Sequence, residues 1–161
     1  MATMRAEEFD ERAFFAAIAQ SQARALLIGR RALIALGIPV GTFDYDFWIH
    51  IDDALLFNQA LHPLGFEPSR TPEEARATGR YVLEDESQRI DVLVARVVPT
   101  VTGERIAFDD IWPRRELLPS AQGATIAIPA LDDLISTKKF GSRSKDLDDV
   151  LFLEALKRKS K

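Results

Sequence analysis

An alternating run of nine residues, FDYDFWIHI at positions 43–51, constrains the fold of this chain most strongly. A period of two built from β-branched and aromatic residues predicts a strand. One side of this strand is apolar, and we expect its aromatic residues Phe43, Tyr45 and Phe47 to lie in the core. The other side carries Asp44, Asp46, Trp48 and His50. The question is why a strand built for burial places two aspartates on one face.

The rest of the chain alternates between helical and strand-like segments without repeats or linkers, which predicts a single domain over residues 1–161. Helices are expected over 7–23, 30–37, 53–65, 131–141 and 143–161, and strands over 25–29, 43–51, 80–85 and 88–98. Residues 99–130 are expected to form short strands and turns. Gly37 is expected to end the second helix.

Composition describes an ordinary globular chain: 161 residues, 47% hydrophobic and 29% charged, with a net charge of -4. The acidic balance disfavours non-specific nucleic-acid binding by the whole surface. The absence of cysteine excludes disulfides, thiolate metal sites and cysteine nucleophiles, and it suits a cytoplasmic protein. No apolar run approaches the roughly 18 residues of a membrane span, so no membrane partner is expected.

The paired aspartates could form a cation site. Side chains two residues apart on a strand share a face, about 6–7 Å apart at the backbone. A third aspartate, Asp91, stands in another apolar strand, RIDVLVA, and could close the site. Buried carboxylates are costly without cations or hydrogen bonds, and Mg²⁺ favours oxygen ligands shared with phosphates. The alternative is a solvated strand face that carries ordinary surface charges.

Several basic residues could balance the charge of a bound triphosphate. They are Arg30, Arg31, Lys138, Arg143 and Lys145. The alternative for each of them is a solvated basic surface. His50, on the aspartate side of the strand, could be a metal ligand or a polar surface group. Trp48, on the same side, is a candidate to contact a base or a sugar.

Three stretches together resemble the minimal nucleotidyltransferases of the polymerase-β superfamily. They are LLIGRRALIALGIPVGTFDYDFWIHI, RIDVLV and LDDLISTKKFGSRSKDLDDVLFLEAL. The similarity is to bacterial proteins of the abortive-infection toxin type and to related uncharacterised proteins. It implies an α+β fold, in which helices flank a small mixed β-sheet.

The resemblance also implies roles for individual residues. Asp44, Asp46 and Asp91 correspond to the catalytic triad, which binds two Mg²⁺ ions, and Asp91 to a base or a metal-bridging group. Gly29 corresponds to the first glycine of a turn that cradles phosphate. Lys138, Arg143 and Lys145 match late basic positions that contact the nucleotide. Asp146 and Asp149 match acidic positions, although they could also be residues that favour a helix start.

Two positions depart from the family pattern. Arg30 replaces the second small residue of the glycine turn, where it could contact phosphate or block the approach of the nucleotide. An arginine often found shortly before the aspartate pair is absent, because Val40 and Gly41 occupy that stretch. Both departures bear on whether the usual nucleotide geometry is kept.

The expected function is Mg²⁺-dependent transfer of a nucleoside monophosphate from an NTP to a hydroxyl of an RNA, a protein or a small molecule. The alternative is a non-catalytic binding module with this fold, or one component of a toxin–antitoxin pair that has an antitoxin partner. A metal nuclease is a third alternative, but no Glu-x-Lys follows Asp91. The spacing of GRRALIALG also differs from that of a Walker-type loop.

Overall fold

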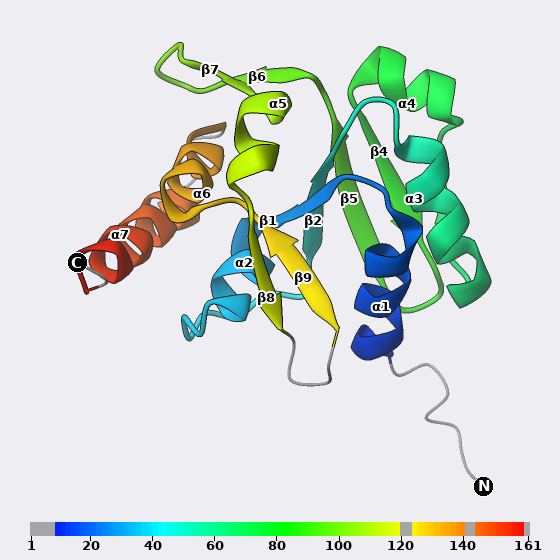
Figure 1. The fold of residues 1–161 in the computed structure, drawn as a ribbon, viewed down its shortest axis with the longest axis horizontal. Helices are drawn as coiled ribbons and strands as arrows, with labels where there is room; N and C mark the ends of the chain where they lie inside the picture. Colours follow the sequence, from blue (N-terminus) through cyan, green and yellow to red (C-terminus); the bar gives the residue numbers. More distant parts are fainter. Residues whose placement is uncertain (1–8, 120–123, 141–143, 160–161) are drawn as a thin grey trace, which may run out of the picture.

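A five-stranded mixed sheet forms the centre of the protein (Figure 1). The computed structural model describes residues 9–119, 124–140 and 144–159. The strand order is β1-β2-β5-β4-β3, in which β2 and β5 run parallel and the other neighbours run antiparallel. The strands are Ala25–Ile28 (β1), Tyr45–Ile49 (β2), Glu67–Pro68 (β3), Arg80–Glu84 (β4) and Arg89–Val94 (β5).

Helices lie on both sides of this sheet, which confirms the predicted α+β class with a small mixed sheet flanked by helices (Figure 1). The α-helices are Glu11–Ser21 (α1), Gly29–Ala35 (α2), Ala54–Leu61 (α3), Pro72–Thr78 (α4), Phe108–Ile111 (α5), Leu131–Thr137 (α6) and Ser144–Lys159 (α7). Short 3-10 helices follow three of them, at His62–Leu64 (η1), Trp112–Arg114 (η2) and Lys138–Phe140 (η3). Among the described residues, no helix is long and apolar enough to cross a membrane.

One face of the sheet carries the main core. Tyr45 and Phe47 of β2 point to this face and pack against Phe14 of α1 and Phe57 of α3, with ring centroids 5.4 Å apart in the pairs Phe14–Tyr45 and Phe47–Phe57. All four side chains are buried. Burial of an aromatic side chain of this kind contributes roughly 1.5–3 kcal/mol, so this cluster fixes which face of β2 is internal. Phe43, however, is 90% exposed because the strand begins only at Tyr45, and the prediction that it lies in the core is wrong.

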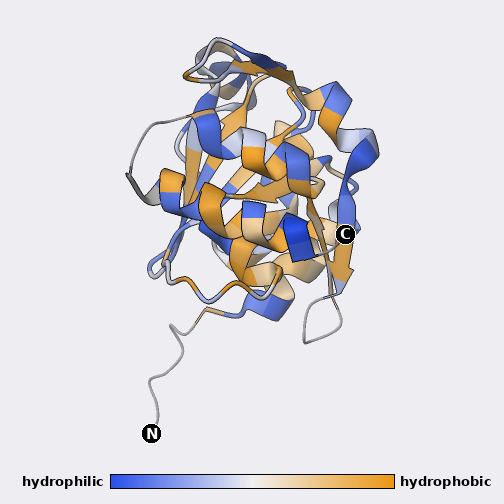
Figure 2. Ribbon diagram, turned by 90° about the vertical axis from the view of Figure 1, so that its left-hand side faces the viewer, coloured by the Kyte–Doolittle hydropathy of each residue, from blue (hydrophilic) through white to orange (hydrophobic). Residues whose placement is uncertain are grey.

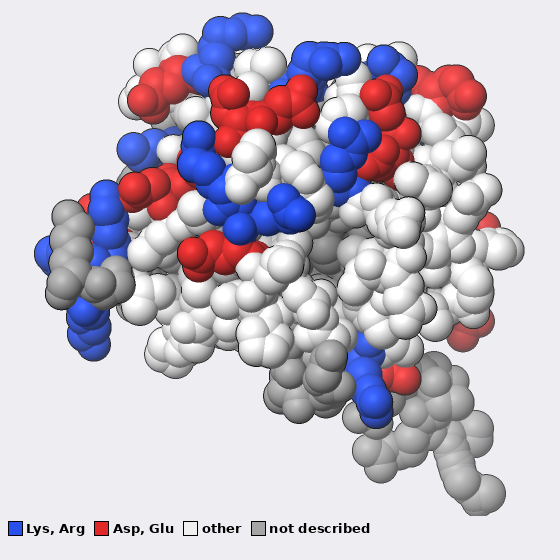
Figure 3. Space-filling model, viewed as in Figure 1, with Lys and Arg blue, Asp and Glu red and all other residues white. Residues whose placement is uncertain are grey.

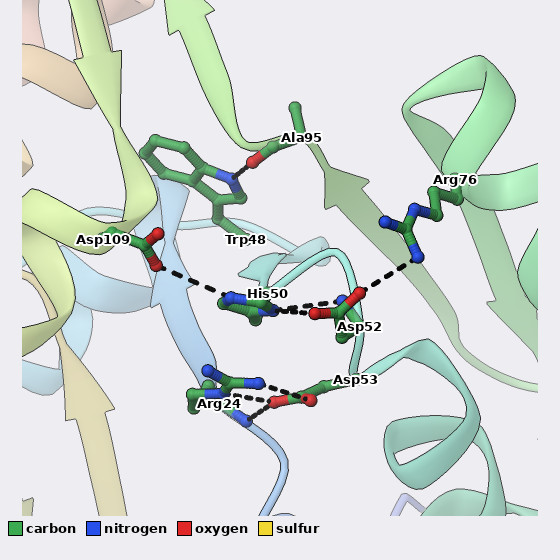
Figure 4. Close-up of polar contacts among 8 residues, drawn as sticks. All are labelled: Arg24, Trp48, His50, Asp52, Asp53, Arg76, Ala95 and Asp109. Atoms are coloured by element: carbon green, nitrogen blue, oxygen red, sulfur yellow. Dashed lines mark hydrogen bonds and ion pairs between the residues drawn. The ribbon is translucent and has the colours of Figure 1, made fainter.

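The opposite face of the sheet is divided into a covered part and an open part. Trp48 lies in the covered part, where its ring packs edge-on against Phe108 of α5 and Phe140 of η3. Its indole N–H donates a hydrogen bond to the carbonyl of Ala95 at 2.8 Å (Figure 4). Trp48 is 0% exposed, so the expectation that it contacts a base or a sugar is wrong. Asp46 shares this face two residues earlier, in the open part.

The remaining strands form two ribbons outside the main sheet. The first pairs Val97–Pro99 (β6) with Arg105–Ala107 (β7), and the second pairs Glu116–Pro119 (β8) with Thr125–Ile128 (β9). Between the ribbons lies α5, whose Phe108 and Ile111 complete the second core beside Trp48. In Figure 2 the central strands are mainly hydrophobic, whereas the outer helices carry hydrophilic segments.

Candidate active site

A cavity of about 800 Å³ opens on the part of the sheet that α5 leaves uncovered. Its walls come from the end of β1, from β2, β5 and β4, and from η3 with the start of α7. Its acidic lining residues are Asp46, Asp91 and Asp146, and its basic ones are Arg70, Arg80, Arg89 and Lys138. A volume of this size is within the range of pockets that hold small organic ligands.

Asp46 and Asp91 face this cavity from neighbouring strands. They are register partners in the parallel pair β2–β5, and adjacent strands lie about 4.8 Å apart. The carboxylate of Asp91 also pairs with the guanidinium of Arg89, with two nitrogens 3.4 Å from Oδ1. The structure therefore brings together two of the three predicted triad residues.

Asp44 is not among the residues that line the cavity. It precedes the first residue of β2 and is exposed. Its backbone N–H donates to the Thr42 hydroxyl at 3.1 Å, and its carbonyl accepts from Arg31 at 3.3 Å. These contacts hold the chain just before the strand begins. Asp44 is therefore not a strand residue, and its side chain need not share the strand face of Asp46.

Gly29 lies directly against Asp46, at the junction of β1 and α2. Its φ of +72° is in the region that favours glycine. A Cβ atom at this position would lie 2.5 Å from Oδ2 of Asp46, which is closer than real contacts permit. The glycine is therefore required both by the backbone and by the space that the Asp46 carboxylate takes.

Carboxylates arranged in this way are ligands that Mg²⁺ accepts when substrate phosphates complete its coordination. Within the described ranges, no group of three His, Asp or Glu residues could hold a metal ion alone. Asp46 and Asp91 are adjacent carboxylates of the cavity lining that could hold such an ion only together with ligands from a bound substrate.

Arg30 points to Asp149 of α7 and is not a cavity-lining residue. Its Nε lies 3.1 Å and its Nη2 3.1 Å from Oδ1 of Asp149, and its Nη1 donates to the carbonyl of Gly41 at 3.3 Å. Its guanidinium group is therefore held by protein atoms of Asp149 and Gly41 and is not part of the cavity lining. The bulky residue in the glycine turn is accommodated because α7 supplies a buried carboxylate.

Lys138 shares the same carboxylate from the cavity side. Its ammonium group lies 2.7 Å from Asp149 Oδ2 and 3.9 Å from Asp146 Oδ1. Asp149 is 0% exposed and pairs with the buried Lys138 and the partly buried Arg30, so it does more than favour the start of a helix. Asp146 stands in the first turn of α7 and also lines the cavity. Arg143 lies outside the described residues, as does the side chain of Lys145.

Sequence reasoning missed Arg70, Arg80 and Arg89, which line the cavity. One signal was available for Arg89, because it stands two residues before Asp91 and so shares its strand face. Arg70 follows the two-residue strand β3, and no periodic pattern predicts its place. Its Nη1 donates to the carbonyl of Arg80 at 2.5 Å, which holds it over the start of β4.

His50 lies beyond Trp48, at the covered end of β2 (Figure 4). Its Nδ1 accepts a hydrogen bond from the N–H of Asp52 at 3.1 Å, and its Nε2 lies 3.6 Å from Asp109 of α5. It is buried and is not one of the residues that line the cavity. Its side chain thus belongs to the packing around α5 and is not the surface group that the alternative described.

Charges of both signs gather over the upper half of the face seen in Figure 3, whereas the lower right part is largely uncharged. Acidic and basic groups are interleaved there, in keeping with the net charge of -4. The cavity lining is mixed in the same way, with three acidic and four basic residues among the described ones.

Three solved structures share this architecture. The protein TM1012 of Thermotoga maritima, provisionally described as a nucleotidyltransferase, superposes with a TM-score of 0.59 at 12% identity, over 92% of this chain and 88% of its own. The antibiotic-resistance factor ANT(2'')-Ia gives 0.58 at 11% identity, over 89% and 80%. The lincosamide antibiotic adenylyltransferase LnuA, with lincomycin bound, gives 0.58 at 13% identity, over 96% and 98%.

This chain therefore has the nucleotidyltransferase fold, as the sequence predicts. At 11–13% identity the similarity extends to the fold alone. No protein-family model matches the chain, and no curated protein matches its sequence.

Proposed function

We propose that this protein is a nucleotidyltransferase that moves a nucleoside monophosphate from an NTP to a hydroxyl group of an acceptor. The observation that carries the proposal is the pair Asp46–Asp91, in register on parallel strands and facing one cavity beside Gly29. The fold supports it, because the similar structures include two proteins described by nucleotidyl transfer or adenylyl transfer.

In the proposed reaction, the acceptor oxygen forms a bond to the α-phosphorus of the NTP. The bond from that phosphorus to the β-phosphate bridging oxygen breaks, and pyrophosphate leaves. The hydroxyl proton passes to a carboxylate oxygen of Asp91, which lines the cavity and so is within reach of an acceptor bound there. The cavity holds the two reactants side by side, so that much of the catalysis is positioning.

Mg²⁺ is the proposed cofactor, with Asp46 and Asp91 as its protein ligands. When bound, it would polarise phosphoryl oxygens and neutralise the developing charge. Lys138, whose ammonium group pairs with the buried Asp149, lines the cavity and would add positive charge near the phosphates. Asp44 is the predicted third ligand. Substitution of Asp44 tests whether the metal is bound by two carboxylates or by three.

Arg30 motivated the alternative of a binding module without catalysis. Because Arg30 is paired with Asp149 and does not line the cavity, the described geometry no longer favours that alternative. The polymerase-β or abortive-infection type of the enzyme, and an antitoxin partner, remain predictions from sequence resemblance.

Thermal unfolding of the wild type and of Asp46→Asn with ATP, CTP, GTP and UTP, with and without Mg²⁺, tests the proposal. A ligand at about 100 times its Kd adds about 2.7 kcal/mol, which is roughly 5–10 °C for a domain of this size. We expect a Mg²⁺-dependent rise with at least one nucleotide, and its loss in Asp46→Asn. If no nucleotide shifts the wild type, the proposal is wrong.

Asp44→Asn is the companion variant in the same assay. A loss of the Mg²⁺-dependent rise equal to that of Asp46→Asn indicates three carboxylate ligands. An unchanged rise indicates that Asp46 and Asp91 suffice. Transfer is then measured with a labelled nucleotide and a panel of RNA, protein and small-molecule acceptors, including lincomycin.

A further inference from the structure

The cavity has two unlike halves, separated by the carboxylate pair. Across one face of the sheet the order is Gly29 at the end of β1, Asp46 on β2, Asp91 on β5 and Arg80 on β4, with Arg70 just after β3. Lys138 lies on the Gly29 side, because η3 and α7 pack beside α2. The two arginines therefore lie on the far side of Asp91 from the turn and the lysine.

Arg80 reaches the cavity from a position diagonal to Asp91. Val82 is the direct register partner of Asp91, and Arg80 shares the strand face of Val82 two residues earlier. Diagonal cross-strand neighbours lie about 7–8 Å apart, within reach of a long side chain. Arg70 is held at the same place by its hydrogen bond to the carbonyl of Arg80.

These two arginines differ from the other cations of the cavity in their charge balance. Arg89 pairs with Asp91, and Lys138 pairs with Asp149. Neither Arg70 nor Arg80 forms an ion pair with any carboxylate in residues 9–119, 124–140 or 144–159. Both side chains are exposed and line the cavity, so among the described residues no carboxylate balances the charge of either guanidinium group. Guanidinium groups on one wall of a cavity suit phosphate, because arginine binds phosphate oxygens in a planar, bidentate manner.

We infer that the acceptor is a phosphate-bearing molecule, whose phosphate binds Arg70 and Arg80 while its hydroxyl approaches Asp91. This inference rests on the proposed nucleotidyl transfer, which places the NTP on the Gly29 and Lys138 side. A polycationic acceptor is disfavoured, because like charges at close range repel. The phosphate could belong to an RNA strand or to a small phosphate ester, which share this chemistry.

Direct binding measurements on the full chain test the inference without requiring turnover. The probes are a short fluorescein-labelled oligoribonucleotide, ribose 5-phosphate and kanamycin, the last being a polycationic compound rich in hydroxyls. The variant is Arg70→Gln with Arg80→Gln, and the matched control is Arg105→Gln, an exposed arginine of β7 outside the cavity. The Kd of the Mg²⁺–NTP complex is measured for every protein.

We expect the double variant to bind a phosphate probe about tenfold or more weakly than the wild type, as charge-assisted contacts are lost. In the Arg105→Gln control, the Kd of the phosphate probe should change by less than about twofold. In the double variant, the Kd of the Mg²⁺–NTP complex should also change by less than about twofold. Tighter binding of the oligoribonucleotide indicates a strand as the acceptor, whereas equal binding of ribose 5-phosphate indicates a small ester. Kanamycin should bind more weakly than either.

Three results would overturn the inference. One is a wild type that binds neither phosphate probe, and another is unchanged phosphate binding in the double variant. The third is a double variant that loses the NTP but keeps the phosphate probes, because the arginines would then hold the triphosphate. Failure of the proposed function is a separate result, in which the wild type binds no NTP with Mg²⁺ at all.

Discussion

The ammonium group of Lys138 lies 2.7 Å from a carboxylate oxygen of Asp149, and both side chains are almost completely buried. Arg30 contacts the same carboxylate from α2, so one aspartate of α7 compensates two cations from different parts of the chain. Removal of one partner from a buried pair is costly, because the remaining charge is left without compensation. Asp149 thus joins α7 to α2 and holds Lys138 at the wall of the cavity.

Asp149→Asn should lower the free energy of unfolding by about 3–5 kcal/mol, the usual cost of breaking a buried ion pair. Urea denaturation measures this change. The matched control is Asp148→Asn, because Asp148 is exposed on the same helix and should change stability by less than about 0.5 kcal/mol. Equal effects of the two variants would show that the buried network does not stabilise the fold.

Gly29→Ala should be more harmful than Gly37→Ala, although both glycines have positive φ, +72° and +87°. A side chain at either position costs about 1–2 kcal/mol of backbone strain. At position 37 a Cβ meets nothing within 4 Å, whereas at position 29 it meets Asp46 at 2.5 Å. We expect only Gly29→Ala to weaken Mg²⁺-dependent nucleotide binding, as measured by thermal shift. Similar binding by the two variants would contradict the steric role of Gly29.

The sequence was sufficient to predict the strand over residues 45–49 and the shared face of Asp46 and Trp48, because both follow from a period of two. The resemblance also implied that Asp91 joins Asp46 in one site, but the sequence alone was not sufficient to predict their direct register, since register depends on pairing between distant segments. The predicted strand faces of Asp44 and Phe43 were wrong for the same reason. The strand begins only at Tyr45, and no residue type marks this boundary in the sequence.

The burial of Trp48 shows a second limit of prediction from the sequence. The strand face of Trp48 was predicted correctly, but part of what covers it is Phe108, from the segment 99–130, where no helix was expected. This helix spans only Phe108–Ile111, which is too short for a helical period to be visible. The contacts of Arg70 and Asp149 could not be predicted from a local pattern either, because their partners lie in other segments of the chain.

Trp48→Phe should lower the free energy of unfolding by about 1–3 kcal/mol, because it removes the hydrogen bond to Ala95 and leaves space in a packed core. It should leave the Kd of a bound nucleotide unchanged. Chemical denaturation and nucleotide titration measure the two quantities. A change in nucleotide Kd without a change in stability would instead place the indole at the ligand.

The ion pair between Arg24 and Asp53 should make stability depend on pH in the acid range. Arg24 donates to Asp53 from its backbone N–H and from Nε, both at 2.8 Å, and from Nη2 at 3.0 Å (Figure 4). Burial acts to raise the pKa of Asp53, but these hydrogen bonds and the charge of Arg24 bring the pKa below its ordinary value. The folded state therefore favours the ionised carboxylate more than the unfolded state does.

A lowered pKa in the folded state stabilises the protein above the unfolded pKa of about 3.9 and loses this contribution as the pH falls through the folded pKa. Asp53→Asn should therefore cost about 1–3 kcal/mol near neutral pH, and its difference from the wild type should shrink below about pH 4. Urea denaturation at several pH values between about 7 and 3 measures this convergence. Asp52→Asn is the control, because the exposed pair of Asp52 with Arg76 should contribute at most about 1 kcal/mol. A difference between Asp53→Asn and the wild type that stays constant with pH would show that Asp53 titrates alike in the folded and unfolded states.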